Sequence, residues 1–238
     1  MPILFFGDLA RYKQSRFKVV TVGLNPSKEE FPKENSFKRF RVMAKHFPFN
    51  GGGTDESFKR DYLASLNSYF SPETKYDWFD NSYEPVLNGM GCSYYSPNYG
   101  NTALHTDYCS PLATRGDWGG LTDSQRMALS KSGNNLWNEL VRYLAPDVMV
   151  ASIRRSLVDQ ILRQFPPNVE PSVVYSISKR KDGSSRSDSY NVLKWKVALD
   201  GNPALLVYAK AAQRPFGSVS LSDRREIGRR TVSETSHE

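Results

Sequence analysis

The chain has 238 residues, and its 32 lysines and arginines against 25 aspartates and glutamates give a formal net charge of +7. This length suits one large α/β domain, residues 1–238, better than two ordinary domains. The charge favours a polyanionic partner, although a merely soluble basic protein has the same balance. No apolar run reaches the roughly 18 residues of a membrane span, so we expect a cytoplasmic protein with no membrane partner.

The sequence offers little material for a metal centre. Cys92 and Cys109 are the only cysteines and form no Cys-x-x-Cys pair, and there are three histidines. These counts argue against a zinc or iron–sulfur site. Signatures of nucleotide cofactors, such as a Gly-x-Gly-x-x-Gly turn, are also missing. We therefore expect no metal, no cofactor and reduced thiols.

The first predicted strand ends in a turn that is typical of a ligand site. Val19, Val20 and Val22 form an apolar run, Gly23 permits a tight backbone path, and an Asn-Pro-Ser turn follows over 25–27. This order places the Asn25 amide at the carboxyl end of a strand, where open α/β folds bind ligands. An Asn-Pro turn without chemistry is the alternative interpretation.

Two helices and a long aromatic segment are predicted next. Apolar residues at helical spacing predict an amphipathic helix over 36–47, and a second helix is predicted over 55–69. Residues 71–101 are rich in aromatic and asparagine residues and show no clear period. Because so long an irregular segment in a compact domain is usually functional, we interpret it as an insertion near the ligand.

The rest of the chain predicts alternating strands and helices. A buried strand begins at Thr102 and opens into a loop near Asp107; helices follow over 124–130 and 135–144, then a strand over 147–152 and a helix over 154–165. This order predicts a three-layer α/β/α sandwich with a mostly parallel central sheet. A strand over 172–178, a basic loop over 179–189 and strands over 191–199 and 204–210 predict an extra hairpin near the C-terminus. A basic helix is predicted over 222–231.

Three sites in this order resemble the motifs of the uracil-DNA glycosylase superfamily, especially its single-strand-selective and thymine/mismatch-specific branches. They are Gly23-Leu24-Asn25-Pro26, His105-Thr106-Asp107-Tyr108-Cys109-Ser110-Pro111-Leu112 and Arg214-Pro215-Phe216. The resemblance implies a monofunctional DNA glycosylase that flips a base into a pocket and hydrolyses its N-glycosidic bond, leaving an abasic site. We expect it to act on DNA as a monomer.

The resemblance also assigns roles to residues. Asn25 would hold the attacking water, and Arg214 stands where relatives carry a histidine, so it would either stabilise the departing base or bind phosphate. Phe216 would wedge into the duplex. The residues expected to bind the substrate are Gly23, Leu24, Pro26, Phe31, His105, Asp107 and Tyr108. Those expected to bind DNA are Ser27, Lys179, Arg180, Pro215, Phe216, Gly217, Ser218 and Arg224.

Asp107 stands where the family is expected to carry an asparagine that reads uracil. A carboxylate only accepts hydrogen bonds and cytosine presents an amino donor, so Asp107 favours a cytosine-type base. Excision of plain cytosine would destroy the host genome, so a second discriminator is needed. The segment 71–101 would supply it by contacting a bulky 5-substituent, such as that of the glucosylated hydroxymethylcytosine of phage DNA, which implies a role in anti-phage defence.

Other interpretations of the sequence stay open. Asp107 would read nothing if it only caps a local turn. The protein would then be a conventional uracil or thymine-mismatch repair glycosylase. The missing motif histidine also fits a catalytically inactive DNA-binding module of the same fold. A small-molecule enzyme that uses the edge of an α/β sheet is a further alternative.

Overall fold

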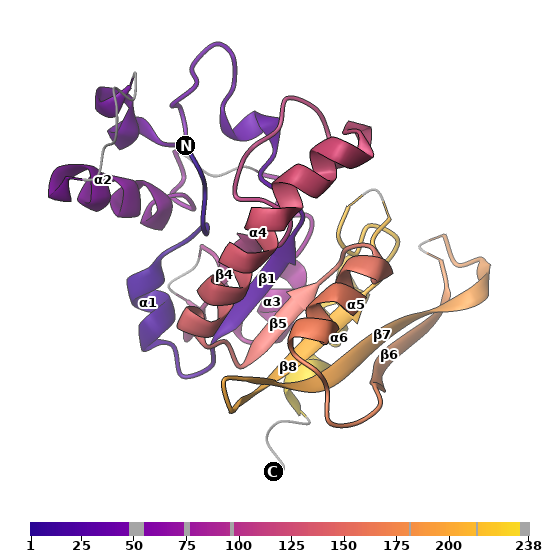
Figure 1. Ribbon diagram of the computed structural model, residues 1–238. Coiled ribbons are helices and arrows are strands. Elements are labelled where there is room, and N and C mark those ends of the chain that lie inside the picture. Colours follow the sequence, from indigo (N-terminus) through magenta and orange to yellow (C-terminus); the bar gives the residue numbers. More distant parts are fainter. Residues whose placement is uncertain (48–54, 74–76, 96–97, 181, 213, 234–238) are drawn as a thin grey trace.

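The computed structural model describes residues 1–47, 55–73, 77–95, 98–180, 182–212 and 214–233 (Figure 1). Its centre is a six-stranded sheet in the order β4-β1-β5-β8-β7-β6. Strands β4, β1, β5 and β8 pair in parallel, whereas β7 is antiparallel to both β8 and β6. The fold is therefore α/β with a mostly parallel sheet, and the hairpin predicted near the C-terminus is confirmed. The strands are β1 (Val19–Gly23), β4 (Leu104–Asp107), β5 (Val148–Ala151), β6 (Ser172–Lys179), β7 (Ser185–Leu199) and β8 (Asn202–Ala209).

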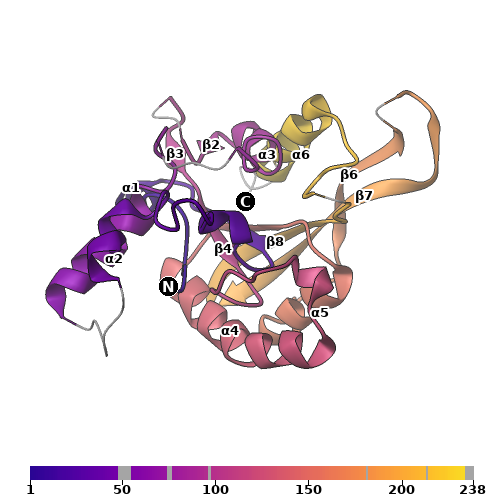
Figure 2. The same cartoon turned by 90° about the horizontal axis from the view of Figure 1, so that it is seen from above.

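Helices cover both faces of the sheet. Helices α4 (Asp123–Leu144) and α5 (Arg155–Gln164) lie on one face, and α3 (Glu84–Gly89) and α6 (Leu221–Ser233) lie on the other (Figure 2). Helices α1 (Leu9–Gln14) and α2 (Glu56–Asn67) lie near the β4 margin of the sheet (Figure 1). Because both faces are covered, β1, β4 and β5 are buried along their whole length, and β1 and β5 are apolar in most positions. None of the described helices is long and apolar enough to cross a membrane.

Helices α3 and α6 pack so closely that their contact needs glycine on both sides. A Cβ on Gly89 would come within 2.0 Å of the Arg225 carbonyl oxygen, and one on Gly228 within 2.0 Å of the Val86 carbonyl oxygen. Real Cβ atoms do not approach backbone this closely, so any larger residue would push the helices apart. This contact ties the segment 71–101, which contains α3, to the C-terminal helix.

Several predicted elements differ from the structure. The helix expected over 36–47 is wrong: only a 3-10 helix, η2 (Arg41–His46), forms there. Phe40 and Met43 are both buried, and their spacing of three residues fits a 3-10 turn as well as an α-helix. The helices expected over 124–130 and 135–144 are one helix, α4, which begins at a capping box of Thr122 and Gln125. The basic loop over 179–189 is shorter, since β7 begins at Ser185.

The composition of the segment 71–101 predicted an irregular structure, but part of the segment is regular. It contains α3 and the short strand β2 (Cys92–Ser93), which pairs with β3 (Asn101–Thr102). Its aromatic residues Phe79, Tyr83 and Tyr94 are buried and pack around Phe70 and His105. Residues 74–76 and 96–97 of this segment lie outside the described residues. The aromatic side chains thus serve the core as well as the site described below.

Five strands end at the same edge of the sheet. The strands β4, β1, β5 and β8 run parallel, and β6 has their direction because it is antiparallel to β7. Their carboxyl ends therefore meet at one edge, where open α/β sheets bind ligands. The loops after β1, β4, β5 and β8 contain most of the residues singled out by the sequence.

Candidate functional site

A pocket of about 980 Å³ opens at the carboxyl edge of the sheet. Its walls come from the segments that follow β1, β4, β5 and β8 and from the aromatic segment before α3. The sequence-predicted residues that line it are Gly23, Leu24, Asn25, Pro26, Ser27, His105, Asp107, Arg214 and Pro215. The structure thus brings together residues from three motifs that lie almost 200 positions apart in the chain.

The backbone holds the first two motifs side by side beyond the ends of their strands. Gly23 is the register partner of Asp107 at the last position of the β1–β4 ladder. Two backbone hydrogen bonds follow beyond the strands: the Tyr108 N–H donates to the Gly23 carbonyl (3.0 Å) and the Cys109 N–H to the Leu24 carbonyl (2.9 Å). Asn25 therefore leaves the sheet at a fixed place next to Asp107.

The hydrogen bonds donated by its nitrogen fix the orientation of the Asn25 amide. Its Nδ2 donates to the Pro26 carbonyl (2.9 Å) and to Thr114 Oγ1 (3.0 Å), and Thr114 Oγ1 donates to the Gly116 carbonyl (2.7 Å). Both amide hydrogens are thereby used. None of the described residues donates to Asn25 Oδ1, which leaves that oxygen as an acceptor at the pocket wall.

Asp107 is a buried carboxylate with an unused oxygen. The residue is 7% exposed, and its Oδ2 has no hydrogen-bond partner. Its Oδ1 lies 3.6 Å from Nε2 of His105, and His105 Nδ1 lies 2.8 Å from Thr21 Oγ1 on β1. A buried unpaired acceptor is costly, and at the wall of a pocket its natural partner is a donor on a ligand.

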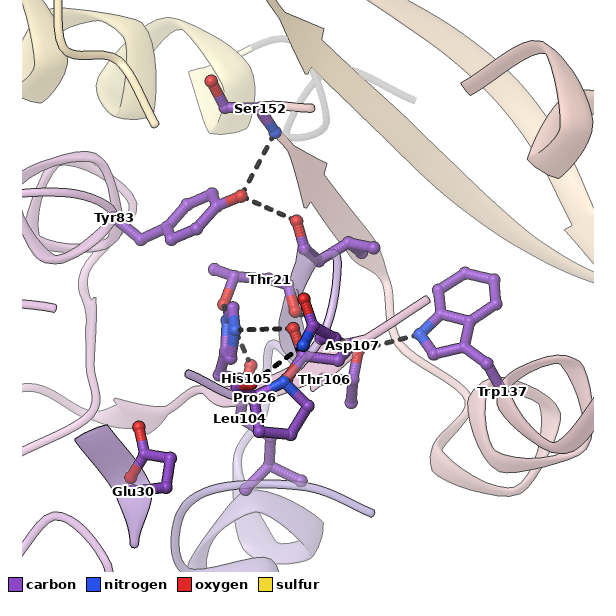
Figure 3. Close-up of polar contacts among 12 residues, drawn as sticks. Thr21, Pro26, Glu30, Tyr83, Leu104, His105, Thr106, Asp107, Trp137 and Ser152 are labelled. Carbon is purple, nitrogen blue, oxygen red and sulfur yellow. Dashed lines mark hydrogen bonds and ion pairs between the residues drawn. The ribbon is translucent and has the colours of Figure 1, made fainter. Parts of the chain in front are cut away.

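Tyr83 joins the ends of two neighbouring strands at the pocket. Its hydroxyl donates to the Val22 carbonyl (2.7 Å) and accepts from the Ser152 N–H (3.2 Å), as Figure 3 shows. Val22 precedes the Gly23-Leu24-Asn25 turn and Ser152 follows β5. Tyr83 therefore fixes the spacing of the two strand ends that border the pocket.

The pocket has acidic walls and a basic rim. Glu30 and Asp107, two buried carboxyl residues, line it together with the aromatic side chains of Trp78, Phe79 and Tyr83. Exposed cations surround them from three different strand ends. They are Lys28, Arg154, Arg155, Lys210 and Arg214. Arg155 pairs with Asp159 at 2.7 Å.

Several predicted site residues lie elsewhere. Tyr108 is buried on the opposite face of β4, where its ring packs edge-on against Trp137, because successive residues of a strand face opposite sides. Phe31 stacks on Phe40 and does not line the pocket. Ser27 lines the pocket, but its hydroxyl accepts from the Glu29 N–H and caps the 3-10 helix η1 (Lys28–Glu30).

Two residues that were expected to bind DNA are buried in the structure. Phe216 is 0% exposed and packs edge-on against Tyr83, so it is not an exposed wedge. Its backbone has a positive φ of 53°, a strained conformation, and its N–H donates to Ser152 Oγ. Arg224 is 4% exposed and donates to the carbonyls of Asn81 and Val219, so it bridges α6 to the segment before α3.

The remaining predicted DNA-binding residues lie outside the pocket. Gly217 and Ser218 follow Phe216 and are half-buried, and the Ser218 carbonyl accepts from Arg186. Lys179 and Arg180 are exposed at the carboxyl end of β6. That end belongs to the same edge of the sheet as the pocket, at the margin opposite β4.

The sequence did not single out Glu30, Trp78, Phe79, Tyr83, Ser152 or Arg154 as site residues. Glu30 carries a misleading signal, since Ser27-Lys28-Glu29-Glu30 matches the Ser-x-x-Glu pattern of a capping box. The aromatic residues belong to the segment 71–101, which was expected near the ligand only as a whole. No protein-family model matches this chain, and no curated protein matches it in sequence.

Proposed function

We propose that this protein is a monofunctional DNA glycosylase with a uracil-DNA glycosylase-like three-layer fold. It would flip a pyrimidine nucleotide out of DNA and hydrolyse the bond between the base and the sugar. The observation that carries the proposal is the position of Asn25 and Asp107 at the ends of two adjoining strands, each with an unused acceptor oxygen at one pocket. The Asn25 oxygen suits a water molecule, and the Asp107 oxygen suits a base.

Asn25 would position the attacking water. Its Oδ1 accepts a hydrogen bond from the water, while Thr114 and the Pro26 carbonyl prevent the amide from turning. The water oxygen bonds to the sugar carbon, the C–N bond breaks, and its electron pair leaves with the base, which becomes protonated as the water loses a proton. An amide is a poor base, so catalysis here relies on positioning and on stabilising charge rather than on proton removal.

The charge pattern matches an extruded nucleotide. A base carries hydrogen-bond donors and would lie against the acidic wall, whereas its flanking phosphates would lie against the exposed cations of the rim. Arg214 is exposed, which favours phosphate contact over direct contact with the buried base. Lys179 and Arg180 would extend the phosphate contacts along the same edge of the sheet.

The favoured substrate is a cytosine-type base with a bulky 5-substituent. Asp107 suits the amino group of cytosine, because a carboxylate accepts hydrogen bonds. The pocket of about 980 Å³ is far larger than one six-membered ring needs, which leaves room for a substituent such as the sugar of glucosylated hydroxymethylcytosine. A glycosylase for such phage bases would act in anti-phage defence.

A panel of substrates tests this proposal. The protein would be incubated with duplex and single-stranded DNA that contains uracil, a thymine mismatch, cytosine, 5-methylcytosine, 5-hydroxymethylcytosine or its glucosylated form, and abasic sites would be scored by alkaline cleavage. We expect cleavage with the glucosylated base and none with plain cytosine. Cleavage at uracil or the mismatch alone would indicate conventional repair. Binding without cleavage of any substrate would indicate an inactive DNA-binding module.

A further inference from the structure

A second buried carboxyl group lines the pocket and has no part in the steps described above. Glu30 ends the 3-10 helix η1, is 2% exposed and belongs to the same pocket wall as Asp107. Figure 3 shows the two residues entering the site from different segments. Its neighbour Glu29 is exposed to solvent.

The contacts of Glu30 use only one of its two oxygens. Oε2 accepts from the Tyr69 hydroxyl (2.7 Å) and lies 3.7 Å from Arg39 Nε, which itself donates to the Glu29 carbonyl (3.0 Å). None of the described residues donates to Oε1. Glu30 is thus a second buried carboxyl residue at the pocket, with one oxygen to which no described residue donates.

Capping of the helix η1 does not require a carboxyl at this position. The helix η1 is capped by Ser27, whose hydroxyl accepts from the Glu29 N–H, and Glu30 takes no part in that cap. Burial raises the pKa of Glu30 to about 7, against the opposing effects of the Tyr69 hydrogen bond and the Arg39 charge. A buried, perturbed carboxyl in a pocket is a common feature of binding and catalytic sites.

We infer that Glu30 is a second specificity-determining residue, which accepts a hydrogen bond from a hydroxyl or amino group on the 5-substituent of the base that Asp107 reads. This inference rests on the proposed function, in which the pocket receives a flipped pyrimidine. Cytosine presents one donor group on its exposed edge, the amino group, and Asp107 is placed to accept from it. The ring position next to that group is C5, so a further donor for Glu30 comes from the substituent there.

The expected preference for a base whose 5-substituent carries a hydroxyl follows from the acceptor oxygen of Glu30. A site built to accept from a substrate hydroxyl rejects an analogue that lacks the hydroxyl, because the buried acceptor is then left without a partner. For a charged acceptor this discrimination is about tenfold or more. Since the ionised form of Glu30 is the better acceptor, the preference should grow between pH 6 and pH 8. The charged and titratable groups that act on Glu30 are Tyr69, Arg39, Asp107 and Glu29.

Two nucleosides that differ by one hydroxyl test the inference directly. Calorimetry would compare binding of 5-hydroxymethyl-2′-deoxycytidine and 5-methyl-2′-deoxycytidine to the full-length protein and to Glu30→Gln, Glu30→Leu and the exposed control Glu29→Gln. We expect wild type and Glu29→Gln to prefer the hydroxymethyl form by about tenfold, and both Glu30 variants to lose that preference. Circular dichroism would verify that the variants fold.

The outcomes separate this inference from the proposed function. If wild type binds both nucleosides equally, or if both folded Glu30 variants keep the preference, Glu30 does not read the substituent. If the preference depends on Glu30 but no DNA base is released, the inference about Glu30 stands and the proposed catalysis fails. A wild-type protein that binds neither nucleoside contradicts the inference.

Discussion

Gly23 and Asp107 face each other at the last rung of the β1–β4 ladder, and the Asp107 carboxylate fills the space that a side chain on Gly23 would occupy. A Cβ on Gly23 would come within 2.3 Å of Asp107 Oδ1 and 2.9 Å of His105 Nε2. The glycine of the first motif therefore serves two purposes. It ends the strand before Asn25, and it leaves room for the carboxylate of the second motif.

We expect Gly23→Ala to impair substrate discrimination, because the methyl group must displace Asp107 or His105. Crowding in a packed site typically costs about 1–3 kcal/mol of folding stability. The matched control is Gly120→Ala, since a Cβ there meets no atom within 4 Å. Urea unfolding and binding of the preferred nucleoside would be measured for both variants. Unchanged binding by a folded Gly23→Ala variant would show that the position of Asp107 does not matter.

Asp107→Asn should lower the preference for cytosine-type bases over uracil by about tenfold or more, because a good contact to a base edge discriminates by about 1–3 kcal/mol. Asn carries an amide in place of a pure acceptor, so it can donate to the O4 carbonyl of uracil, which a carboxylate cannot do. The control is Asp117→Asn, another carboxyl at the pocket, which is exposed. Rates on matched cytosine-type and uracil substrates give the ratio. An unchanged ratio would make Asp107 a structural residue.

Glu30 should make folding stability depend on pH. Its pKa is raised from 4.5 to about 7 in the folded protein, so the folded state holds a proton that the unfolded state has lost between these values. Stability is therefore lost as the pH rises through this window, by about 3 kcal/mol in all. Gln has no such proton. The stability of Glu30→Gln relative to wild type should rise by about that amount from pH 4.5 to pH 8 in urea titrations, and a pH-independent difference would contradict the buried carboxyl.

Binding to DNA should weaken steeply with salt through the rim cations. If Lys28, Arg154, Lys210 and Arg214 each neutralise one phosphate, the slope of log K against log salt would be roughly −3 to −4 on duplex DNA. Arg214→Gln should reduce the slope by about 1. Arg225→Gln is the control, because Arg225 is exposed on α6 and does not line the pocket. Equal slopes for both variants would remove Arg214 from the DNA interface.

The sequence predicted the part of the site that depends on strands. A buried run that stops at Gly23 places Asn25 at a sheet edge, and a second strand that ends at Asp107 reaches the same edge because the two strands are parallel. These predictions follow from local pattern and from the known handedness of α/β connections. They explain why Asn25 and Asp107, which are far apart in the chain, line one pocket.

The sequence did not predict the burial of several side chains at and near the site, because that burial depends on tertiary packing. Phe216 and Arg224 have the residue types of a wedge and a phosphate contact, yet the contact between α3 and α6 and the ring of Tyr83 enclose them. Glu30 lies in a charged segment that is typical of a solvent-exposed surface, yet it is buried against Tyr69. Elements that are distant in the sequence decide whether such residues are buried. Local sequence patterns do not reveal these tertiary contacts.

Base release by wild type and by Asn25→Ala is the most direct measurement of the central claim. Under single-turnover conditions on the DNA that the wild type cleaves best, we expect Asn25→Ala to release the base at least a hundredfold more slowly, roughly the range found for one lost positioning or charge-stabilising group, with DNA affinity nearly unchanged. Affinity should persist because Asn25 is not one of the rim cations. Equal rates of base release by the two proteins, or no abasic sites with either, would contradict the account.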